Sequence, residues 1–378
     1  MLFLKEKGVE AMTKLIEPLT FKRGLVLKNR VFMAPMTTKM SFYDGVVTQD
    51  EIEYYSMRAG EIGAVITGAA NVQEDGKGWE GELGVYDDKF IPGLAKLASG
   101  IKRNGTKAIL QIFHGGRMTN SQVLRGVQPV SASAVAAERP NAEVPRAMES
   151  EEVVALISNF AAATKRAIAA GFDGVELHGA NTYLIQQFFS PHSNRREDEW
   201  GGSLEKRFHF VEELVKAVTA VVDESGADGF IVGYRFSPEE YETPGIRFED
   251  TLYLVDHLAD MPLDYLHISL NQADKRSASE DYQEKSMMAY VYEKLAGRLP
   301  LIGVGDVRTG QDAEEILAKA DGVAIGKALL MDPNWLPKAV NGQEELIRQE
   351  LSRFDCDELK ISNGVWGFLE SMMPERLH

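Results

Sequence analysis

The sequence predicts a single (β/α)8 barrel, an α/β fold in which eight parallel strands are each followed by a helix. Apolar strand-like runs alternate with helical patterns along the chain, which is typical of βα units around a parallel sheet. Eight such runs occur, and 378 residues suit one barrel with insertions. An open doubly wound sheet is the competing fold. It is disfavoured because no GxGxxG follows the first strand, where such a sheet binds a dinucleotide.

The predicted strands are short apolar runs bounded by Gly, Pro or polar residues. They cover residues 29–36, 63–72, 107–114, 172–177, 229–236, 263–270, 300–307 and 322–325. Helical patterns fall between strands at residues 49–59, 92–104, 150–170, 204–223 and 248–259. Ser150 is the expected N-cap of the third of these helices, with Glu151 and Glu152 near the positive end of its dipole.

Three segments lie outside the repeating units. Residues 115–146, after the third strand, contain Pro129, Pro140 and Pro145 and are predicted to form an extended loop with room for a short hairpin. Loops of this length in compact domains usually serve a function. Residues 1–14 are expected to be a flexible N-terminal extension, and residues 341–378 a helical tail. No linker or repeat interrupts the sequence, so we expect one domain over residues 1–378.

Composition and charge exclude several classes of protein. The net charge of −16, from 57 acidic and 41 basic residues, disfavours nucleic acid or an anionic membrane as the main partner. The single cysteine, Cys356, rules out an intramolecular disulfide framework and an all-cysteine iron–sulfur cluster. No apolar run approaches the ~20 residues that cross a bilayer, and the N-terminal residues lack the order of a signal peptide. We expect a cytoplasmic protein with a small-molecule substrate, whose oligomeric state the sequence leaves open.

Glycines and cations follow the last predicted strands. Gly303 and Gly305 end the seventh, and Gly326 and Lys327 end the eighth. Loops after these two strands commonly bind phosphate in barrels, through backbone N–H groups near a helix N-terminus. A phosphate site is favoured over the alternative of plain tight turns.

Other polar residues end earlier strands. Arg235, at the end of the fifth, is expected to face an anionic group, although an ion-pair role is the alternative. His114 and His267 are interpreted as barrel residues with satisfied hydrogen bonds. No His/Glu arrangement has the spacing of a zinc motif, so we predict no metal.

The most informative stretch is residues 172–203, FDGVELHGANTYLIQQFFSPHSNRREDEWGGS. It begins as an apolar strand, opens at His178-Gly179, and presents the polar side chains of His178, Asn181 and Tyr183. A loop rich in Arg, Asn and Trp follows. Because barrels hold their chemistry at the C-terminal ends of their strands, this stretch predicts an active site.

Several motifs together resemble the Old Yellow Enzyme family. They are APMT at residues 34–37, LQIFHGGR at 110–117, HGANTYLIQQFFSPHSNRREDEWGGSLEKR at 178–207, RFSP at 235–238 and VGD with AIGKALL near the end. The resemblance covers roughly residues 15–337. It implies a barrel ene-reductase with tightly bound, non-covalent FMN and with NADH or NADPH as electron donor.

The resemblance also implies roles for individual residues. His178 and Asn181 correspond to the pair that holds the carbonyl oxygen of the substrate, and Tyr183 corresponds to the proton donor. The remaining matched positions correspond to flavin contacts. Those at the ring are Pro35, Met36, Thr37, Ala69, Gln111 and Arg235, and those at the phosphate are Gly305, Asp306, Gly326 and Lys327.

The sequence departs from the family pattern in three ways. Thr182 stands where the family often has Gly, which is expected to reshape the loop that carries Tyr183. Lys327 stands where Arg is usual, and it supplies charge without the planar fork of a guanidinium. The iron–sulfur cluster and second flavin domain of the long-chain relatives are not expected here.

The resemblance implies transfer of a hydride from NAD(P)H to an activated C=C of an α,β-unsaturated carbonyl compound or a similar electrophile. Alternatives remain open at this stage. Within flavin barrels they are oxidative N-demethylation and dienoyl-CoA reduction. Outside them they are a flavin-free lyase or aldolase acting on a phosphorylated substrate, and a flavin-binding module without catalysis.

Overall fold

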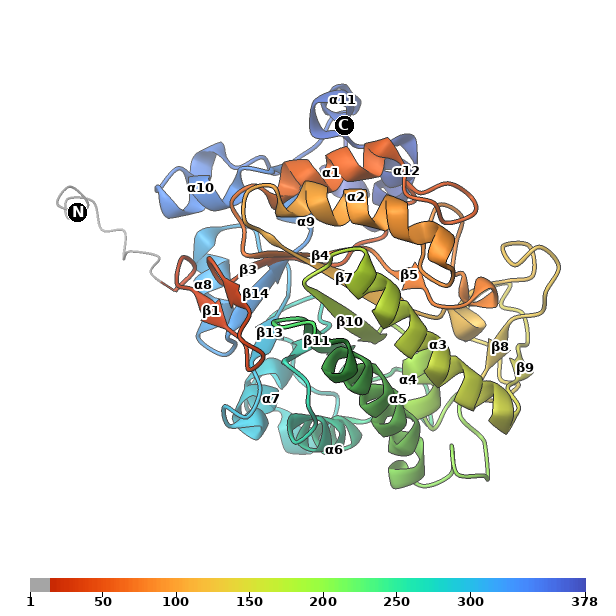
Figure 1. Ribbon diagram of the computed structural model, residues 1–378. Coiled ribbons are helices and arrows are strands. Elements are labelled where there is room, and N and C mark those ends of the chain that lie inside the picture. The colour runs from red at the N-terminus through yellow and green to blue at the C-terminus, as the bar shows by residue number, and fades with distance from the viewer. Residues whose placement is uncertain (1–13) are drawn as a thin grey trace.

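A computed structural model describes residues 14–378 and confirms the (β/α)8 barrel (Figure 1). Eight parallel strands close into a ring, because β10 pairs with both β11 and β7. Neighbours around the ring follow the order of the chain. The strands are β3 (Val31–Met33), β4 (Ala64–Ile66), β7 (Lys107–Phe113), β10 (Gly174–Gly179), β11 (Ile231–Phe236), β12 (Tyr265–Ile268), β13 (Leu301–Gly303) and β14 (Gly322–Ile325).

Helices surround the barrel, each after a strand (Figure 1). They are α1 (Gln49–Ala59), α2 (Ile91–Lys102), α3 (Ser150–Ala169), α4 (Leu184–Phe189), α5 (Leu204–Ser225), α6 (Phe248–Ala259), α7 (Met287–Leu295), α8 (Gly310–Leu317), α9 (Lys327–Met331) and α10 (Trp335–Val340). Side-chain caps begin several of them, as at Thr48, Ser203 and Thr309. Such caps satisfy N–H groups that have no partner within the helix.

The cap of α3 differs from the prediction. Glu149, not Ser150, is the N-cap, and it forms a reciprocal capping box with Glu152. The Ser150 hydroxyl instead accepts a hydrogen bond of 2.8 Å from the indole N–H of Trp200. The N-cap is therefore one residue earlier than predicted, and Ser150 is the first residue of the helix.

A short antiparallel hairpin, β1 (Leu19–Thr20) with β2 (Val26–Leu27), closes the N-terminal end of the barrel. Its buried side chains, including Phe21 and Leu27, pack in one apolar cluster with inward-facing residues of the barrel strands such as Phe32 and Ile231. In Figure 1 the hairpin lies at one end of the barrel, opposite α4. The other end is left for the loops that follow the strands.

The predicted second strand is two strands. β4 ends at Ile66, and the chain resumes as β5 (Ala70–Asn71), which pairs with the end of β7 and with β6 (Leu83–Gly84). Between them the N–H of Gly68 donates to the hydroxyl of Tyr55 at 2.6 Å. This bond to α1 replaces the ladder bond that a continuous strand would make.

The loop after β7 contains no hairpin. β8 (Val130–Ser131) and β9 (Arg146–Ala147) do pair, but they run parallel, which a tight turn cannot achieve. The intervening residues 132–145 form the crossover. Of the predicted N-terminal extension, residues 1–13 lie outside the described residues, whereas Lys14 is held by a 2.7 Å bond from its ammonium to the carbonyl of Leu317.

The predicted helical tail is present as α11 (Cys356–Leu359) and α12 (Asn363–Met372), with short 3-10 turns between them and α10 and after α12. Arg58 of α1 anchors it: the buried guanidinium donates to the carbonyls of Leu330 and Leu359, both at 2.9 Å. Among residues 14–378, no helix combines the length and apolar character that a membrane span requires.

Candidate active site

Three predicted polar residues lie side by side inside the open end of the barrel. The strand register places His178 of β10 opposite Arg235 of β11, and Arg235 opposite His267 of β12. All three side chains are buried. Neighbouring parallel strands therefore bring together residues that are far apart in sequence.

His178 is held as a neutral imidazole. Burial lowers its pKa well below the ordinary value, and the nearby charges of Arg235 and His267 act in the same direction. Its Nδ1 is buried and has no hydrogen-bond partner within the described residues. A neutral ring keeps one N–H to donate and one nitrogen to accept.

Asn181 is fixed through both its backbone and its amide. Its φ of 54° is left-handed, and its N–H donates to the Ser237 hydroxyl at 2.9 Å. Its Oδ1 accepts from the Ser269 hydroxyl at 2.9 Å, and that hydroxyl accepts from Arg235 at 3.2 Å. This arrangement assigns the carbonyl side of the amide to Ser269, so the Nδ2 group is the one left to donate to a ligand.

Tyr183 lies within an aromatic cluster. Its ring centroid is 5.0 Å from both His178 and Phe113, and 6.1 Å from Trp79. Burial, and secondarily the negative charge of Glu82, raise the pKa of Tyr183 to about 12, so the phenol stays protonated at neutral pH. Trp79 was not predicted, although a lone Trp in a Gly-rich segment after the second strand could have indicated it.

A buried polar network lies below these residues. The Glu176 carboxylate accepts hydrogen bonds from Gln111 Nε2 at 2.7 Å, from the Tyr265 hydroxyl at 3.1 Å and from His267 Nδ1 at 2.9 Å. Gly233 makes room for Tyr265, because a Cβ there would overlap the ring. Sequence reasoning missed Glu176, yet its position two residues before His178 on one strand puts both on the same face.

The charges of the network favour an ionised Glu176. Burial opposes ionisation, but His267, through its charge and hydrogen bond, together with Arg235 and Gln111, outweighs it, and the pKa of Glu176 is lowered. The interpretation of His267 and His114 as fully satisfied residues is only half right. Nδ1 of each ring has a partner. Nε2 of His267 is buried without a hydrogen bond in the described residues, whereas Nε2 of His114 lies 3.5 Å from the Asp75 carboxylate.

The residues predicted to contact the flavin ring reach the same end of the barrel. Pro35, Met36 and Thr37 follow β3 and are half-buried, and Ala69 lies buried between β4 and β5. The chain after Thr37 is held by a carboxyl group of α1, as Thr38 and Ser41 both donate hydroxyl hydrogen bonds to Glu51, at 2.8 Å and 2.6 Å.

The loop after β13, where the sequence predicts part of a phosphate site, has an unusual backbone conformation. Gly305 has a φ of 154°, and a Cβ there would overlap the backbone N of Ala273. Asp306 follows at a φ of 45°. Its carboxylate pairs with Arg308 at 2.8 Å, so only its backbone N–H is suited to an anion. Lys327 begins α9 and, within residues 14–378, forms no ion pair.

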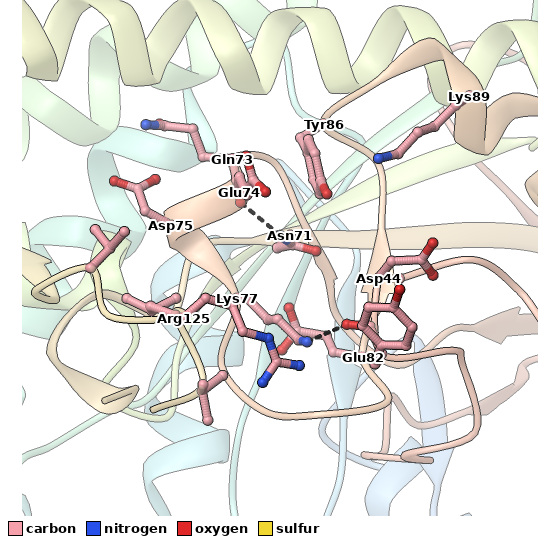
Figure 2. Close-up of a pocket in the computed structure, with 15 residues that line it drawn as sticks. Asp44, Asn71, Gln73, Glu74, Asp75, Lys77, Glu82, Tyr86, Lys89 and Arg125 are labelled. Atoms are coloured by element: carbon pink, nitrogen blue, oxygen red, sulfur yellow. Dashed lines mark hydrogen bonds between the residues drawn. The ribbon is translucent and has the colours of Figure 1, made fainter. Parts of the chain in front are cut away.

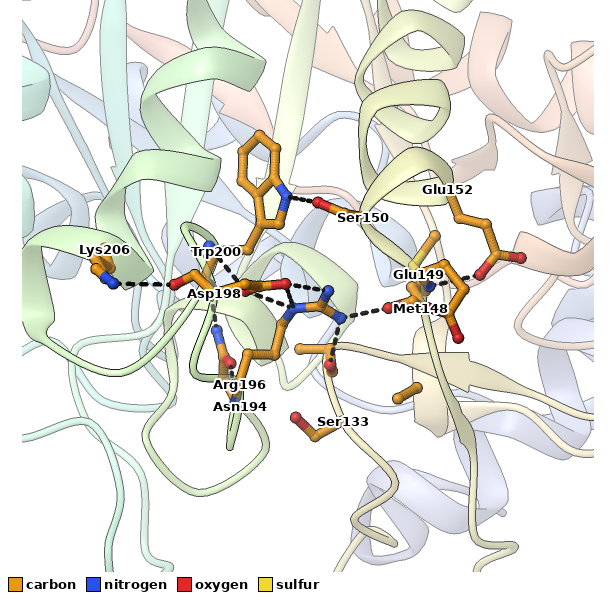
Figure 3. Close-up of polar contacts among 12 residues, drawn as sticks. Ser133, Met148, Glu149, Ser150, Glu152, Asn194, Arg196, Asp198, Trp200 and Lys206 are labelled. Atoms are coloured by element: carbon orange, nitrogen blue, oxygen red, sulfur yellow. Dashed lines mark hydrogen bonds and ion pairs between the residues drawn. The ribbon is translucent and has the colours of Figure 1, made fainter.

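One arginine joins the two long loops beside the site (Figure 3). Arg196 pairs with Asp198 at 2.5 Å and donates to the carbonyls of Ala132, at 3.1 Å, and Met148. It thereby ties residues 190–203 to the crossover after β7, which was predicted as an extended loop. The Arg-rich part of the informative stretch thus has a clear positioning role.

One group of side chains in the described residues has a geometry compatible with a metal ion: His209, Glu212 and Glu213 on α5. Both carboxylates already pair with Lys216, at 2.9 Å and 3.0 Å. The group lies on one face of a helix and contributes nothing to the site described above.

Comparisons with known proteins agree with this geometry. The sequence profile described as "NADH:flavin oxidoreductase / NADH oxidase family" matches residues 14–345. A probable NADH-dependent flavin oxidoreductase of Bacillus subtilis is 42% identical over 93% of this chain and 94% of its own length. The solved structure of an old yellow enzyme homologue from Zymomonas mobilis superposes with a TM-score of 0.76 at 26% identity, covering 87% of this chain and 93% of that one.

Two longer relatives are similar over nearly the whole chain. An NADH:acrylate oxidoreductase of Vibrio harveyi and an NADH:fumarate oxidoreductase of Klebsiella pneumoniae are each 45% identical over 96% of it. The chain spans only 36% and 40% of their respective lengths. Because the profile covers most of the chain, and the similarity to the Bacillus protein extends over more than nine tenths of both chains, the chain belongs to the NADH:flavin oxidoreductase / NADH oxidase family.

Proposed function

We propose that this protein is an FMN-dependent ene-reductase, which uses NADH or NADPH to reduce the activated C=C of an α,β-unsaturated carbonyl compound or a similar electrophile. The observation that carries the proposal is the contact of a neutral His178 with a protonated Tyr183, at 5.0 Å between ring centroids, together with the Asn181 amide that Ser269 orients. Family membership removes the flavin-free lyase or aldolase from consideration.

The residues present fit FMN. Arg235 is buried, and its Nε has no hydrogen-bond partner in the described residues, so it has a donor available for a polar ring edge. Gln111 is oriented by Glu176. Gly326 lies close to Met36, since a Cβ there would be only 3.2 Å from Met36 Sδ, so the glycine lets the backbone after β14 approach this predicted ring contact. When bound, FMN would take a hydride from NAD(P)H and return it to the substrate.

In this proposal Pro35, Met36, Thr37 and Ala69 line the ring, and Arg235 balances negative charge at its polar edge. The backbone N–H groups of Gly305, Asp306, Gly326 and Lys327 would hold the phosphate, with the Lys327 ammonium adding charge. The Asp306 carboxylate would remain with Arg308. A lysine here lacks the bidentate fork of an arginine, so the backbone carries more of the recognition.

The catalytic residues would act on the substrate. His178 and Asn181 each donate a hydrogen bond to the carbonyl oxygen, and these bonds strengthen as negative charge develops there. Tyr183 donates its proton to the carbon next to the carbonyl group, on which the second hydrogen must arrive. The aromatic cluster of Trp79, Phe113 and His178 holds the phenol in place and limits access of water.

The test is an anaerobic two-step titration of the purified protein. A yellow protein should bleach on addition of NADH or NADPH and recover its colour on addition of 2-cyclohexenone. Acrylate and fumarate, which appear in the names of two relatives, are further electrophiles to test in the second step. Tyr183→Phe should slow the recovery by about 10²-fold or more, which is typical of losing a general acid, and should leave the bleaching intact.

Tyr241→Phe is the matched control, because Tyr241 is 88% exposed. A colourless protein would show that no flavin is bound and would contradict the proposal. If the Tyr183→Phe variant recovers its colour as fast as the unaltered protein, the proton comes from another group. If the protein bleaches but no electrophile restores the colour, the chain is a flavin dehydrogenase without ene-reduction.

A further inference from the structure

A cavity lies close to the candidate active site. It has a volume of about 600 Å³ and lies between three loop segments at the open end of the barrel, residues 43–45, 71–89 and 123–127 (Figure 2). None of the residues to which we assign catalysis or flavin contact lines it. Its volume is within the range of small-molecule sites.

One short segment, residues 77–82, contacts both this cavity and the aromatic cluster of the active site. The side chains of Lys77 and Glu82 line the cavity. Trp79, between them, points the other way and packs its ring 5.5 Å from Phe113 and 6.1 Å from Tyr183. The cavity therefore lies next to the segment that packs on Tyr183.

Cations and aromatic faces line the cavity together. Lys89 lies over the ring of Tyr86 at 5.3 Å, and Arg125 lies over that of Tyr43 at 5.9 Å. Lys77 and Arg125 share a single carboxylate, Glu80. The ammonium of Lys89 also lies over the ring of Phe90 at 5.0 Å. Such cations bind phosphate oxygens, and aromatic faces stack on nucleobases.

Two of the lining residues also hold buried acceptors. Oε1 of Glu82 and Oε1 of Gln73 are buried without a hydrogen-bond partner in the described part of the chain. Glu82 is only 2% exposed, and burial raises its pKa well above the usual range. Asp44, Glu74 and Asp75 add carboxylates to the lining (Figure 2). In Rossmann folds a carboxylate beside the adenosine ribose accepts from the 2′-hydroxyl of NAD and disfavours the 2′-phosphate of NADP, and Asp44, Glu74 and Asp75 supply that chemistry here.

We propose that this cavity binds the adenosine diphosphate half of the electron donor and favours NADH over NADPH. The inference rests on the proposed function, which requires a reduced dinucleotide at the flavin. The pyrophosphate would lie against Lys77, Lys89 and Arg125, and the adenine against Tyr43 or Tyr86. The nicotinamide would reach the active site past Trp79.

The test compares donors that share a nicotinamide but differ in the adenylate half. Flavin reduction is followed by stopped flow with NADH, NADPH and reduced nicotinamide mononucleotide. We expect NADH to bind most tightly, and we expect the double variant Lys89→Gln/Arg125→Gln to reduce the ratio between the mononucleotide and NADH dissociation constants by about tenfold or more, the loss of at least one charge-assisted hydrogen bond. Lys22→Gln, an exposed lysine of the β1–β2 hairpin at the other end of the barrel, should leave the ratio unchanged.

A second readout does not depend on catalysis. ADP-ribose, titrated calorimetrically into the full-length protein, should bind, should bind more weakly to the double variant, and should compete with NADH. Equal affinity for NADH and the mononucleotide, or an unchanged ratio in the double variant, would overturn the inference while leaving the proposed function intact. A protein that binds ADP-ribose but is not reduced by any of the three donors would instead overturn the proposed function.

Discussion

The two halves of the barrel interior are built from the same strands and have opposite chemistry. Along β11, Ile231 faces the apolar cluster beneath the hairpin, Gly233 makes room for Tyr265, and Arg235 belongs to the polar end. Along β7, Ile109 belongs to the same apolar cluster, and Gln111 donates a hydrogen bond to Glu176 in the polar half. A packed hydrocarbon core and a polar site are thus separated by four residues along β11 and by two along β7.

Because of this difference, stability and function are coupled in one half and separate in the other. In the apolar half, each side chain contributes to stability through its contact area, and the stability lost on substitution grows with the volume removed. In the polar half, buried groups depend on one another, because a lost partner leaves a desolvated donor or acceptor. The polar half should therefore respond to substitution more steeply.

The largest effect is expected at Glu176. Glu176→Leu would leave the side chains of Gln111, Tyr265 and His267 buried without their acceptor, and removal of one partner from such a buried charged network typically costs about 3–5 kcal/mol. The free energy of unfolding by urea measures this. Glu176→Gln, which keeps the shape and one acceptor oxygen, should lose less.

Ile231→Val is the control from the apolar half. Removing one methylene group there should cost about 0.5–1.5 kcal/mol and should leave the rate of flavin reduction per folded molecule unchanged. A loss at Glu176→Leu no larger than that at Ile231→Val would show that the two halves respond alike, and the proposed contrast would fail.

The comparison also shows why sequence reasoning found one half of the site more easily than the other. His178, Asn181 and Tyr183 lie within six residues, so a local motif identifies them. Glu176 acts through Gln111 and Tyr265, which are distant in sequence, and Ser269 orients Asn181 from another strand. Such contacts depend on strand register, which the positions of apolar runs do not specify.

The barrel itself was predictable because each βα unit repeats the same pattern. Segments without that repetition were predicted less well. The split of residues 63–72 into β4 and β5 depends on the hydrogen bond from Gly68 to Tyr55, and the parallel pairing of β8 with β9 depends on the path of the crossover. Both are tertiary contacts with no local signal.

Glu51 is a second buried carboxyl group, and it differs from Glu176 because its hydrogen-bond partners are hydroxyl groups and no cationic side chain of the described residues pairs with it. Burial raises the pKa of Glu51 from 4.5 to about 7, although Ser41 and Thr38 donate hydrogen bonds to it. The folded protein thus holds this proton at a pH where the unfolded chain releases it. The free energy of unfolding should fall by about 3 kcal/mol as the pH rises from 4.5 to 7, and this contribution is fully present only below that window.

Glu51→Gln should abolish that part of the pH dependence, since an amide does not titrate. Urea unfolding at several pH values between 4.5 and 7 measures it, and the difference between the two proteins isolates Glu51 from all other titrating groups. If both proteins show the same slope, the carboxyl group is ionised in the fold, and Glu51 and Glu176 behave alike.

The smallest effect concerns Thr182, the departure from the family pattern between two residues proposed as catalytic. Its φ of 64° is strained for a β-branched residue, at a cost of about 1–3 kcal/mol. Two side chains hold it there, since Gln186 accepts from its N–H at 2.9 Å and Gln187 donates to its carbonyl at 2.7 Å. Thr182→Gly relieves the strain but adds about 0.4–1 kcal/mol of backbone entropy to the unfolded chain, so a net gain of about 1 kcal/mol is expected.

Thermal unfolding measures this gain, and Ala296→Gly is the matched comparison, because Ala296 has a φ of 49° at the end of α7 without a branched side chain. Thr182→Gly should stabilise more than Ala296→Gly. If the strain also fixes Asn181 and Tyr183 for catalysis, then Thr182→Gly should slow the recovery of colour with cyclohexenone while it raises stability, whereas Ala296→Gly should change stability alone. If Thr182→Gly raises both stability and the rate of recovery, relief of backbone strain does not harm the polar end of the barrel. The threonine would then have no part in the chemistry.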